Sequence, residues 1–200
     1  MSKNVLVIGT GTIGEPLIGL LAEHKESLGL DKVIFFKRTP LSEERGKVEA
    51  LIRKGAEIVS TNDAISEFHQ LGFNETKDVE LAYEEADVII DCTPSGNDNW
   101  ETVYSSLSQD KRFLAQGSEH GFGPFFAWGI NNEILSDDSN KFLIASCNTH
   151  NIASIVKSFA LDQQRNLTEG KFVCLRRAND VSQNDSFSPS PTITKHTNQA

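Results

Sequence analysis

A cysteine in this sequence stands where a thiol can act as a nucleophile. Cys147 follows the apolar run of residues 142–145 and precedes residues 152–159, whose apolar side chains recur with helical spacing. The partial positive charge at a helix N-terminus favours the thiolate form of a thiol placed there, and a thiolate adds to carbonyl carbons. The amide of Asn148 and neighbouring backbone N–H groups would stabilise the oxyanion that this addition creates. The segment therefore predicts covalent catalysis on a carbonyl substrate.

The alternative interpretation of Cys147 is a structural one. A single cysteine at the end of a strand is more often a small buried hydrophobic residue than a nucleophile. We interpret Cys92 and Cys174 in that way. The sequence holds three cysteines at wide spacing, which fits neither a disulfide framework nor a zinc site. We predict no metal site.

A glycine-rich loop near the N-terminus predicts a dinucleotide-binding site. It reads Gly9-Thr10-Gly11-Thr12-Ile13-Gly14 and lies between the apolar run of residues 5–8 and a helical pattern. In this motif the first glycine permits a tight turn, the second lets backbone approach a pyrophosphate, and the third lets helix and strand pack closely. The helix N-terminus adds N–H groups and partial positive charge. The alternative is a glycine-rich turn without a ligand.

The residues after the second apolar strand, residues 33–36, predict the type of cofactor. A fold that selects NAD places a carboxylate about 20 residues after the loop, where it accepts hydrogen bonds from the adenosine ribose. Here Lys37 and Arg38 follow the strand instead. Two cations suit a 2′-phosphate, so we predict NADP as the preferred cofactor, with NAD also used. The alternative is a solvated basic pair at the start of a surface loop.

The elements that position these residues follow an α/β pattern. Short apolar runs alternate with amphipathic stretches, which predicts a doubly wound parallel sheet of Rossmann type. The runs are residues 5–8, 33–36, 88–90, 113–115 and 142–145. Ligands in such a sheet bind at the carboxyl ends of the strands. A helix capped by Ser42 and ended by Gly55 is also expected, as is an irregular tail from Asn179.

Composition excludes several classes of protein. The 200 residues are 38% hydrophobic and 24% charged, which is ordinary for a chain that buries a core. The net charge of -9 leaves no general basic face, so we expect no nucleic-acid partner. No apolar run approaches the roughly 20 residues needed to span a bilayer, and the N-terminus leads directly into a strand. We therefore expect no membrane partner and a cytoplasmic location.

Several stretches together resemble the archaeal-type (type II) phosphorylating glyceraldehyde-3-phosphate dehydrogenases. They occur in order at residues 11–14, 84–94, 116–117, 146–149 and 176–178. The resemblance implies a Rossmann domain at residues 1–145 and, at residues 146–200, the incomplete start of an α+β catalytic domain. It also implies a homotetramer when the chain has its full length.

The same resemblance implies a reaction and a set of site residues. Cys147 would add to the aldehyde of glyceraldehyde 3-phosphate, hydride would pass to the nicotinamide, and inorganic phosphate would cleave the thioester to 1,3-bisphosphoglycerate, a step of glycolysis and gluconeogenesis. The substrate-contacting residues would be Ser146, Asn148 and Thr149. The cofactor-contacting residues would include Thr12, Ile13, Gly117 and Arg176, with Thr93 and Pro94 in the same crevice.

The sequence departs from the family at two places. His150 and Asn151 replace the second threonine and the glycine that usually continue the cysteine motif, so we expect phosphate binding next to the nucleophile to be altered. The acid-base histidine of the family lies beyond the aligned residues, and we do not expect His120, His150 or His196 to replace it. We therefore expect either a truncated subunit, which would bind the cofactor weakly without turning over substrate, or a natural remnant.

Two other classes share parts of this pattern. A different NADP-dependent enzyme, such as a relative of aspartate-semialdehyde dehydrogenase, would have the same fold and thioester chemistry with a carboxylate substrate. A non-catalytic dinucleotide-binding module would share the glycine loop without needing a reactive thiol.

Overall fold

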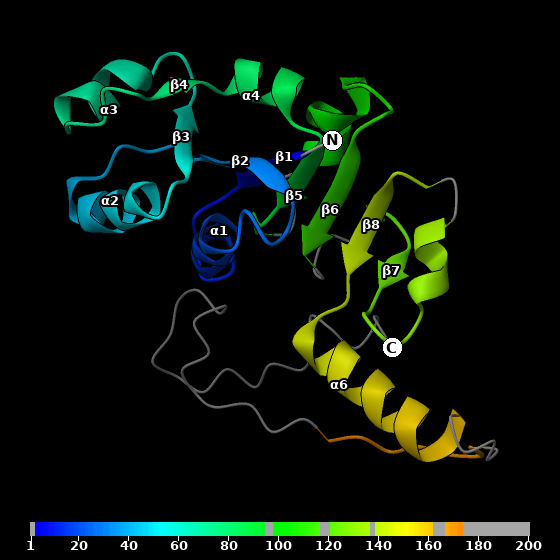
Figure 1. Ribbon diagram of the computed structural model, residues 1–200. Coiled ribbons are helices and arrows are strands. Elements are labelled where there is room, and N and C mark those ends of the chain that lie inside the picture. The colour runs from blue at the N-terminus through cyan, green and yellow to red at the C-terminus, as the bar shows by residue number, and fades with distance from the viewer. Residues whose placement is uncertain (1–2, 95–97, 117–120, 137–138, 162–166, 174–200) are drawn as a thin grey trace. The chain divides into compact units, whose positions relative to one another are not determined.

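The computed structural model describes residues 3–94, 98–116, 121–136, 139–161 and 167–173 (Figure 1). The chain divides into two compact units, Met1–Ala115 and Gln116–Ala200. The expected functional division at residue 145 stays a prediction, and the expected irregular tail from Asn179 lies outside the described residues.

The first unit is built from alternating strands and helices. Its strands are β1 (Lys3–Ile8), β2 (Leu30–Phe36), β3 (Glu57–Ser60), β4 (Lys77–Asp78), β5 (Val88–Asp91) and β6 (Arg112–Gln116). Its helices are α1 (Gly14–Glu23), α2 (Arg45–Arg53), α3 (Ile65–Gln70), α4 (Val79–Glu85) and α5 (Asn99–Thr102), with 3₁₀ turns η1 (Ser42–Glu44) and η2 (Tyr104–Ser106).

The strands of this unit form a parallel sheet in the order β4-β3-β2-β1-β5-β6. The chain moves outward from β1 to β4 and then returns to place β5 on the other side of β1. This reversal creates a switch point between β1 and β5, at whose carboxyl ends a doubly wound sheet binds its ligands. The order confirms the predicted Rossmann-type α/β fold.

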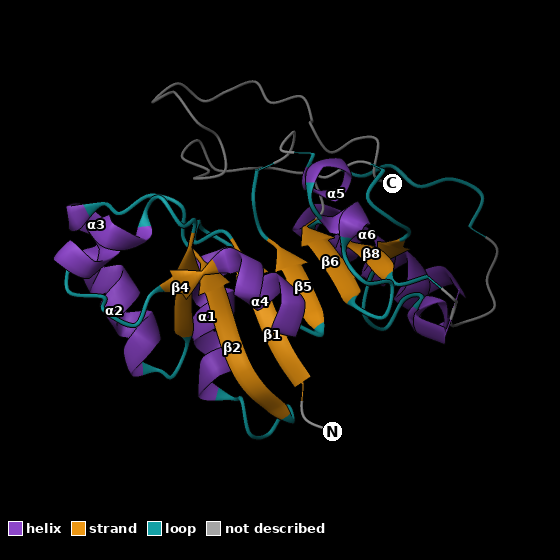
Figure 2. Cartoon of the chain, turned by 90° about the horizontal axis from the view of Figure 1, so that it is seen from above, coloured by secondary structure: helices purple, strands orange, loops and turns teal. Residues whose placement is uncertain are grey.

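Alternate residues of β1 bury opposite faces of the sheet. Val5 and Val7 pack in one cluster with Ile18 of α1 and Leu51 of α2. Figures 1 and 2 show α1 and α2 on one side of the sheet and α4 on the other. Complete burial of a side chain such as Ile18 contributes about 1.5–3 kcal/mol. This packing fixes the carboxyl ends of β1 and β2, where the predicted site lies.

One expectation about local structure was wrong, and several elements were not predicted. Ser42 does not cap α2, because the chain first makes the turn η1 and the helix begins only at Arg45, without a side-chain capping bond. The stretch after α2, for which no element was predicted, holds β3, α3, β4 and α4. The expected end of α2 is confirmed, since Gly55 has φ +95° and donates its N–H to the Ile52 carbonyl at 2.9 Å.

The second unit contains a short parallel strand pair and a helix that carries the thiol. Its elements are β7 (Phe125–Phe126), the 3₁₀ helix η3 (Asn132–Ser136), β8 (Lys141–Ile144), α6 (Cys147–Val156) and a π-helical turn at Lys157–Leu161. Phe125 pairs with Leu143 and Phe126 with Ile144. The predicted strand before Cys147 and the predicted helix after it are both present. In the described part of the chain, no helix has the length and hydrophobicity to cross a bilayer.

Candidate dinucleotide site and reactive thiol

The glycine loop joins β1 to α1 at the centre of the sheet. Gly9 has φ +98°, a conformation that side chains disfavour. A Cβ at position 14 would lie 1.9 Å from the Gly9 carbonyl oxygen, whereas a Cβ at position 11 would meet nothing within 4 Å. The first and third glycines are therefore required by the fold, and the second faces open space.

The N-terminus of α1 is open at this loop. Ile13 occupies the N-cap position without a side-chain capping bond, and Gly11, Thr12 and Ile13 are exposed. Glu15 donates its backbone N–H to the Gly11 carbonyl at 3.0 Å, which begins the first turn. An uncapped helix N-terminus beside an unfilled glycine position suits an anionic group such as a pyrophosphate.

The carboxyl end of β5 lies against the same loop. The backbone N–H of Cys92 donates to the Ile8 carbonyl at 2.8 Å, and a Cβ on Gly9 would come within 3.4 Å of the Thr93 nitrogen. Pro94, the next residue, is exposed. The structure thus brings Thr93 of the predicted crevice next to the glycine loop, as the switch-point argument requires.

A buried carboxylate that we did not predict holds this segment. Asp91, the last residue of β5, is 5% exposed. One of its oxygens accepts from the Thr93 N–H at 2.8 Å and from the Thr93 hydroxyl at 2.6 Å. The other accepts from Asn99 Nδ2 at 2.7 Å and from the Tyr104 hydroxyl at 2.9 Å. Four donors compensate the burial of this carboxylate, which fixes the turn at Thr93.

The groups packed around Asp91 are kept neutral. Burial, followed by the charge of Asp91, raises the pKa of the Cys92 thiol to about 12. Burial also raises the pKa of the Tyr104 hydroxyl, which stays a hydrogen-bond donor to the carboxylate. Cys92 therefore has the structural role predicted for it, as a buried and protonated thiol.

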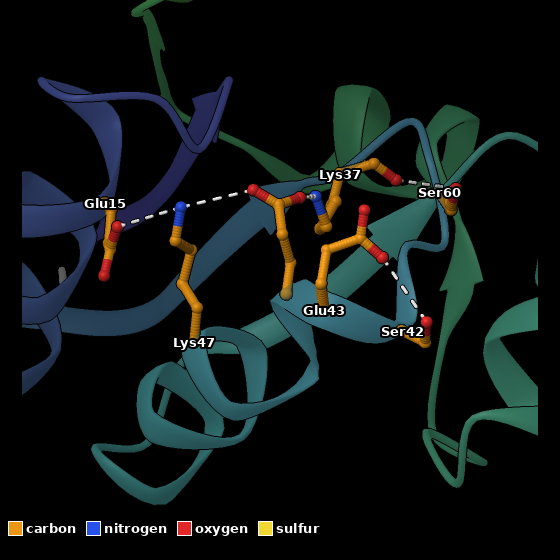
Figure 3. A network of polar contacts seen from close by, with 7 residues as sticks. Glu15, Lys37, Ser42, Glu43, Lys47 and Ser60 are labelled. Atoms are coloured by element: carbon orange, nitrogen blue, oxygen red, sulfur yellow. Dashed lines mark hydrogen bonds and ion pairs between the residues drawn. The ribbon is translucent and has the colours of Figure 1, made fainter. Parts of the chain in front are cut away.

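The end of β2 differs from the expected open basic pair. Lys37 is only 6% exposed, and its ammonium forms an ion pair with Glu44 of η1. The hydrogen bond from Lys37 lowers the pKa of the Glu44 carboxyl. Figure 3 shows the extended network, in which Lys47 contacts both Glu44 at 3.3 Å and Glu15 at 3.2 Å. Arg38, by contrast, is exposed.

The thiol segment begins α6 in the second unit. Ser146 is the N-cap, and its hydroxyl accepts from the Thr149 N–H at 3.3 Å and lies 2.9 Å from the Thr149 hydroxyl. Cys147 is the first helical residue and is exposed, and Asn148 is partly buried. His150 places its ring Nε2 3.1 Å from the Trp128 carbonyl, which fits a hydrogen-bonding role rather than a free base. The thiol is thus accessible at a capped helix N-terminus.

Several predicted residues lie outside the described part of the chain. They are Gly117, Arg176, Cys174, His120 and His196. The roles assigned to Gly117 and Arg176 stay predictions. Within the described residues, no group of three or more His, Cys, Asp or Glu side chains is arranged to hold a metal ion.

The strand order and the loop define the first unit as a Rossmann-type α/β domain. No protein-family profile matches the chain. The glyceraldehyde-3-phosphate dehydrogenase of Methanobrevibacter smithii is 28% identical over 185 residues, which cover 90% of this chain and 52% of that protein. The corresponding enzyme of Sulfurisphaera tokodaii is 28% identical over 158 residues, covering 76% and 42%. These relatives confirm the resemblance to the archaeal glyceraldehyde-3-phosphate dehydrogenases, and the chain spans about half the length of the curated relatives it matches.

Two solved dehydrogenase structures also superpose on part of this chain. Aspartate semialdehyde dehydrogenase II of Vibrio cholerae superposes with a TM-score of 0.49 at 13% identity, over 78% of this chain and 46% of that one. Glucose dehydrogenase of Haloferax mediterranei gives 0.41 at 14% identity, over 78% and 41%. Similarity at this level says nothing about function. The Rossmann-type fold follows from the strand order of the sheet.

Proposed function

We propose that this chain binds a nicotinamide dinucleotide and supplies the nucleophilic thiol of a phosphorylating aldehyde dehydrogenase of the glyceraldehyde-3-phosphate type. The observation that carries the proposal is the glycine loop. It leaves position 11 unfilled beside an uncapped helix N-terminus, while positions 9 and 14 are closed by backbone contacts. Relatives named glyceraldehyde-3-phosphate dehydrogenase align over 90% of the chain.

The residues of the first unit fit such a cofactor. The backbone at Gly11, Thr12 and Ile13 would hold the pyrophosphate, because its N–H groups lie at the positive end of the α1 dipole. The adenosine ribose would lie toward the end of β2, where exposed Arg38 suits a 2′-phosphate. Thr93 and Pro94 would line the crevice at the switch point. When bound, the dinucleotide supplies a hydride acceptor.

The thiol of Cys147 would perform the covalent chemistry. Its sulfur adds to the aldehyde carbon, and the oxygen takes up a proton to give a hemithioacetal. Loss of hydride from that carbon, with loss of the hydroxyl proton, leaves a thioester. An oxygen of inorganic phosphate then attacks the thioester carbonyl and releases the acyl phosphate and the thiolate. Ser146, Asn148 and Thr149 would contact the substrate beside the sulfur.

The test is dinucleotide reduction by the full-length protein with defined aldehydes, because the acid-base histidine of the relatives lies outside the residues that align with this chain. Glyceraldehyde 3-phosphate and aspartate semialdehyde are supplied in turn with NADP or NAD, with and without inorganic phosphate, beside a Cys147→Ala variant. We expect phosphate-dependent reduction with glyceraldehyde 3-phosphate, lost in the variant. Preference for aspartate semialdehyde would replace the proposed substrate with a carboxylate one. Binding of the dinucleotide without reduction of any substrate would contradict the proposed activity and favour a non-catalytic binding module.

A further inference from the structure

Lys37 is a buried cation at the strand end where the ribose site is expected. It directly follows β2, the strand whose end distinguishes NAD from NADP in this fold. Its side chain is 6% exposed, and its ammonium is already matched by the carboxylate of Glu44. A buried ammonium paired in this way is not a free partner for a further anion. A 2′-phosphate would have to compete with Glu44 or share Lys37 with it.

The pair belongs to a larger network that reaches the glycine loop. Glu44 also accepts from Lys47 at 3.3 Å, and Lys47 contacts Glu15 in the first turn of α1 at 3.2 Å (Figure 3). The network therefore runs from the N-terminal turn of α1 to the end of β2. It holds two ammonium groups and two carboxylates, so its formal charges cancel. A neutral network gives little net attraction to the additional charge that distinguishes NADP from NAD.

We propose that Glu44 is a specificity-determining residue that reduces selection for NADP by occupying Lys37. The inference rests on the proposed dinucleotide site. With Glu44 present, exposed Arg38 is the main cation for a 2′-phosphate, and NAD and NADP bind with similar affinities. Without the Glu44 charge, Lys37 and Arg38 together favour NADP. The residue that sets the relative affinity for NAD and NADP thus lies in η1 and not at the end of β2.

The substitution Glu44→Gln tests this proposal. The glutamine keeps the length of the side chain and can accept the hydrogen bond from Lys37, but the network then carries one net positive charge. We expect the ratio of the NAD and NADP dissociation constants to shift toward NADP by about fivefold, an effect of the size expected for one partly buried charge pair. The measurement is titration of the 200-residue chain with each dinucleotide by calorimetry at fixed ionic strength.

Glu43→Gln is the matched control. Glu43 is the neighbouring residue of η1, and its carboxylate accepts from the Ser42 hydroxyl at 3.3 Å (Figure 3). The substitution Glu43→Gln removes the same charge one residue away. We expect it to change the ratio of the NAD and NADP dissociation constants by less than about twofold. Equal shifts in Glu43→Gln and Glu44→Gln would overturn the proposal, because a general charge effect would then explain both.

Lys37→Met provides a second, independent test. The substitution removes one of the two cations paired with Glu44. The network then carries one net negative charge, so NADP should lose more affinity than NAD. In that background, adding Glu44→Gln should give a smaller shift than in the wild-type chain, because the Lys37 ammonium is no longer there to be released. An unchanged ratio in Glu44→Gln, with both dinucleotides bound, would overturn the selectivity role alone. Absence of binding by the wild-type chain would overturn the dinucleotide site and this inference with it.

Discussion

A Cβ atom at position 14 would lie 1.9 Å from the carbonyl oxygen of Gly9. The obstructing atom belongs to backbone, which cannot move aside as a flexible side chain would. Gly14→Ala should therefore force β1 and α1 apart and lower the free energy of unfolding by about 3 kcal/mol. Urea denaturation followed by circular dichroism measures the change.

Gly11→Ala is the control for this prediction. A Cβ there meets nothing within 4 Å, and the residue has no positive φ. Its free energy of unfolding should stay within about 0.5 kcal/mol of that of the wild-type chain. Equal losses of stability in the two variants would contradict the different roles assigned to Gly11 and Gly14.

Asp91 should support both stability and the shape of the cofactor crevice. Asp91→Asn replaces one acceptor oxygen by an NH₂ group that faces donors, either at Thr93 or at Asn99 and Tyr104. We expect a loss of about 2 kcal/mol in the free energy of unfolding and weaker dinucleotide binding well below the melting temperature. Calorimetric titration beside thermal melts separates the two effects.

Tyr104→Phe is the comparison for Asp91→Asn. It removes one of the four donors and leaves the Asp91 carboxylate and its bonds to Thr93 in place. Its cost should be about 1 kcal/mol, with dinucleotide affinity nearly unchanged. If Tyr104→Phe weakened binding as much as Asp91→Asn, the bonds to Thr93 would not be what positions the crevice.

The two described cysteines should differ sharply in reactivity. Cys147 is exposed at the N-terminus of α6, whereas burial raises the pKa of Cys92 to about 12. At pH 8, iodoacetamide should modify Cys147 at least about tenfold faster than Cys92, as measured by peptide mass spectrometry over time. The Cys147→Ser variant should lose the fast phase. Comparable slow labelling at both positions would speak against an active thiol.

Asp87 should make stability depend on pH. Its carboxylate accepts from the Asn4 N–H at 2.8 Å and from Lys3 Nζ at 2.9 Å, and these bonds lower the pKa of Asp87 in the folded chain. The stabilisation is therefore present above the unfolded pKa of about 4 and is lost as pH falls through the lower folded value. Asp87→Asn should cost about 1 kcal/mol at pH 7, a small value because the pair is exposed, and less at pH 2. Urea midpoints of both chains at the two pH values test this, and an equal difference at both would contradict it.

Local patterns in the sequence were sufficient to predict the framework of the first unit. The apolar run at β1, the glycine loop and the helix at α1 are adjacent in the chain, so their spacing is enough to define them. Strand β3 was missed because its apolar centre is only two residues long, Ile58 and Val59, with polar Glu57 and Ser60 at its ends. Strand β4 has only two residues and no pattern that could be recognised.

Side-chain pairings across turns could not be predicted in the same way. Lys37 was expected to face a cofactor, but the turn η1 brings Glu44 to its ammonium, and no periodicity signals that contact. Asp91 was visible as an acid ending an apolar strand. Its role depends on Asn99 and Tyr104, which reach it only because η2 and α5 fold back over the end of β5.

The most direct test of the central claim is binding of NADPH to the 200-residue chain, followed by calorimetry, with Gly11→Ala as the comparison. The account predicts saturable binding at one site per chain, weakened at least about tenfold in a Gly11→Ala variant that is as stable as the wild type, because the added methyl group fills the space meant for the pyrophosphate. Absence of saturable binding, or equal affinity in the two chains, would contradict the assignment of the glycine loop as a dinucleotide site.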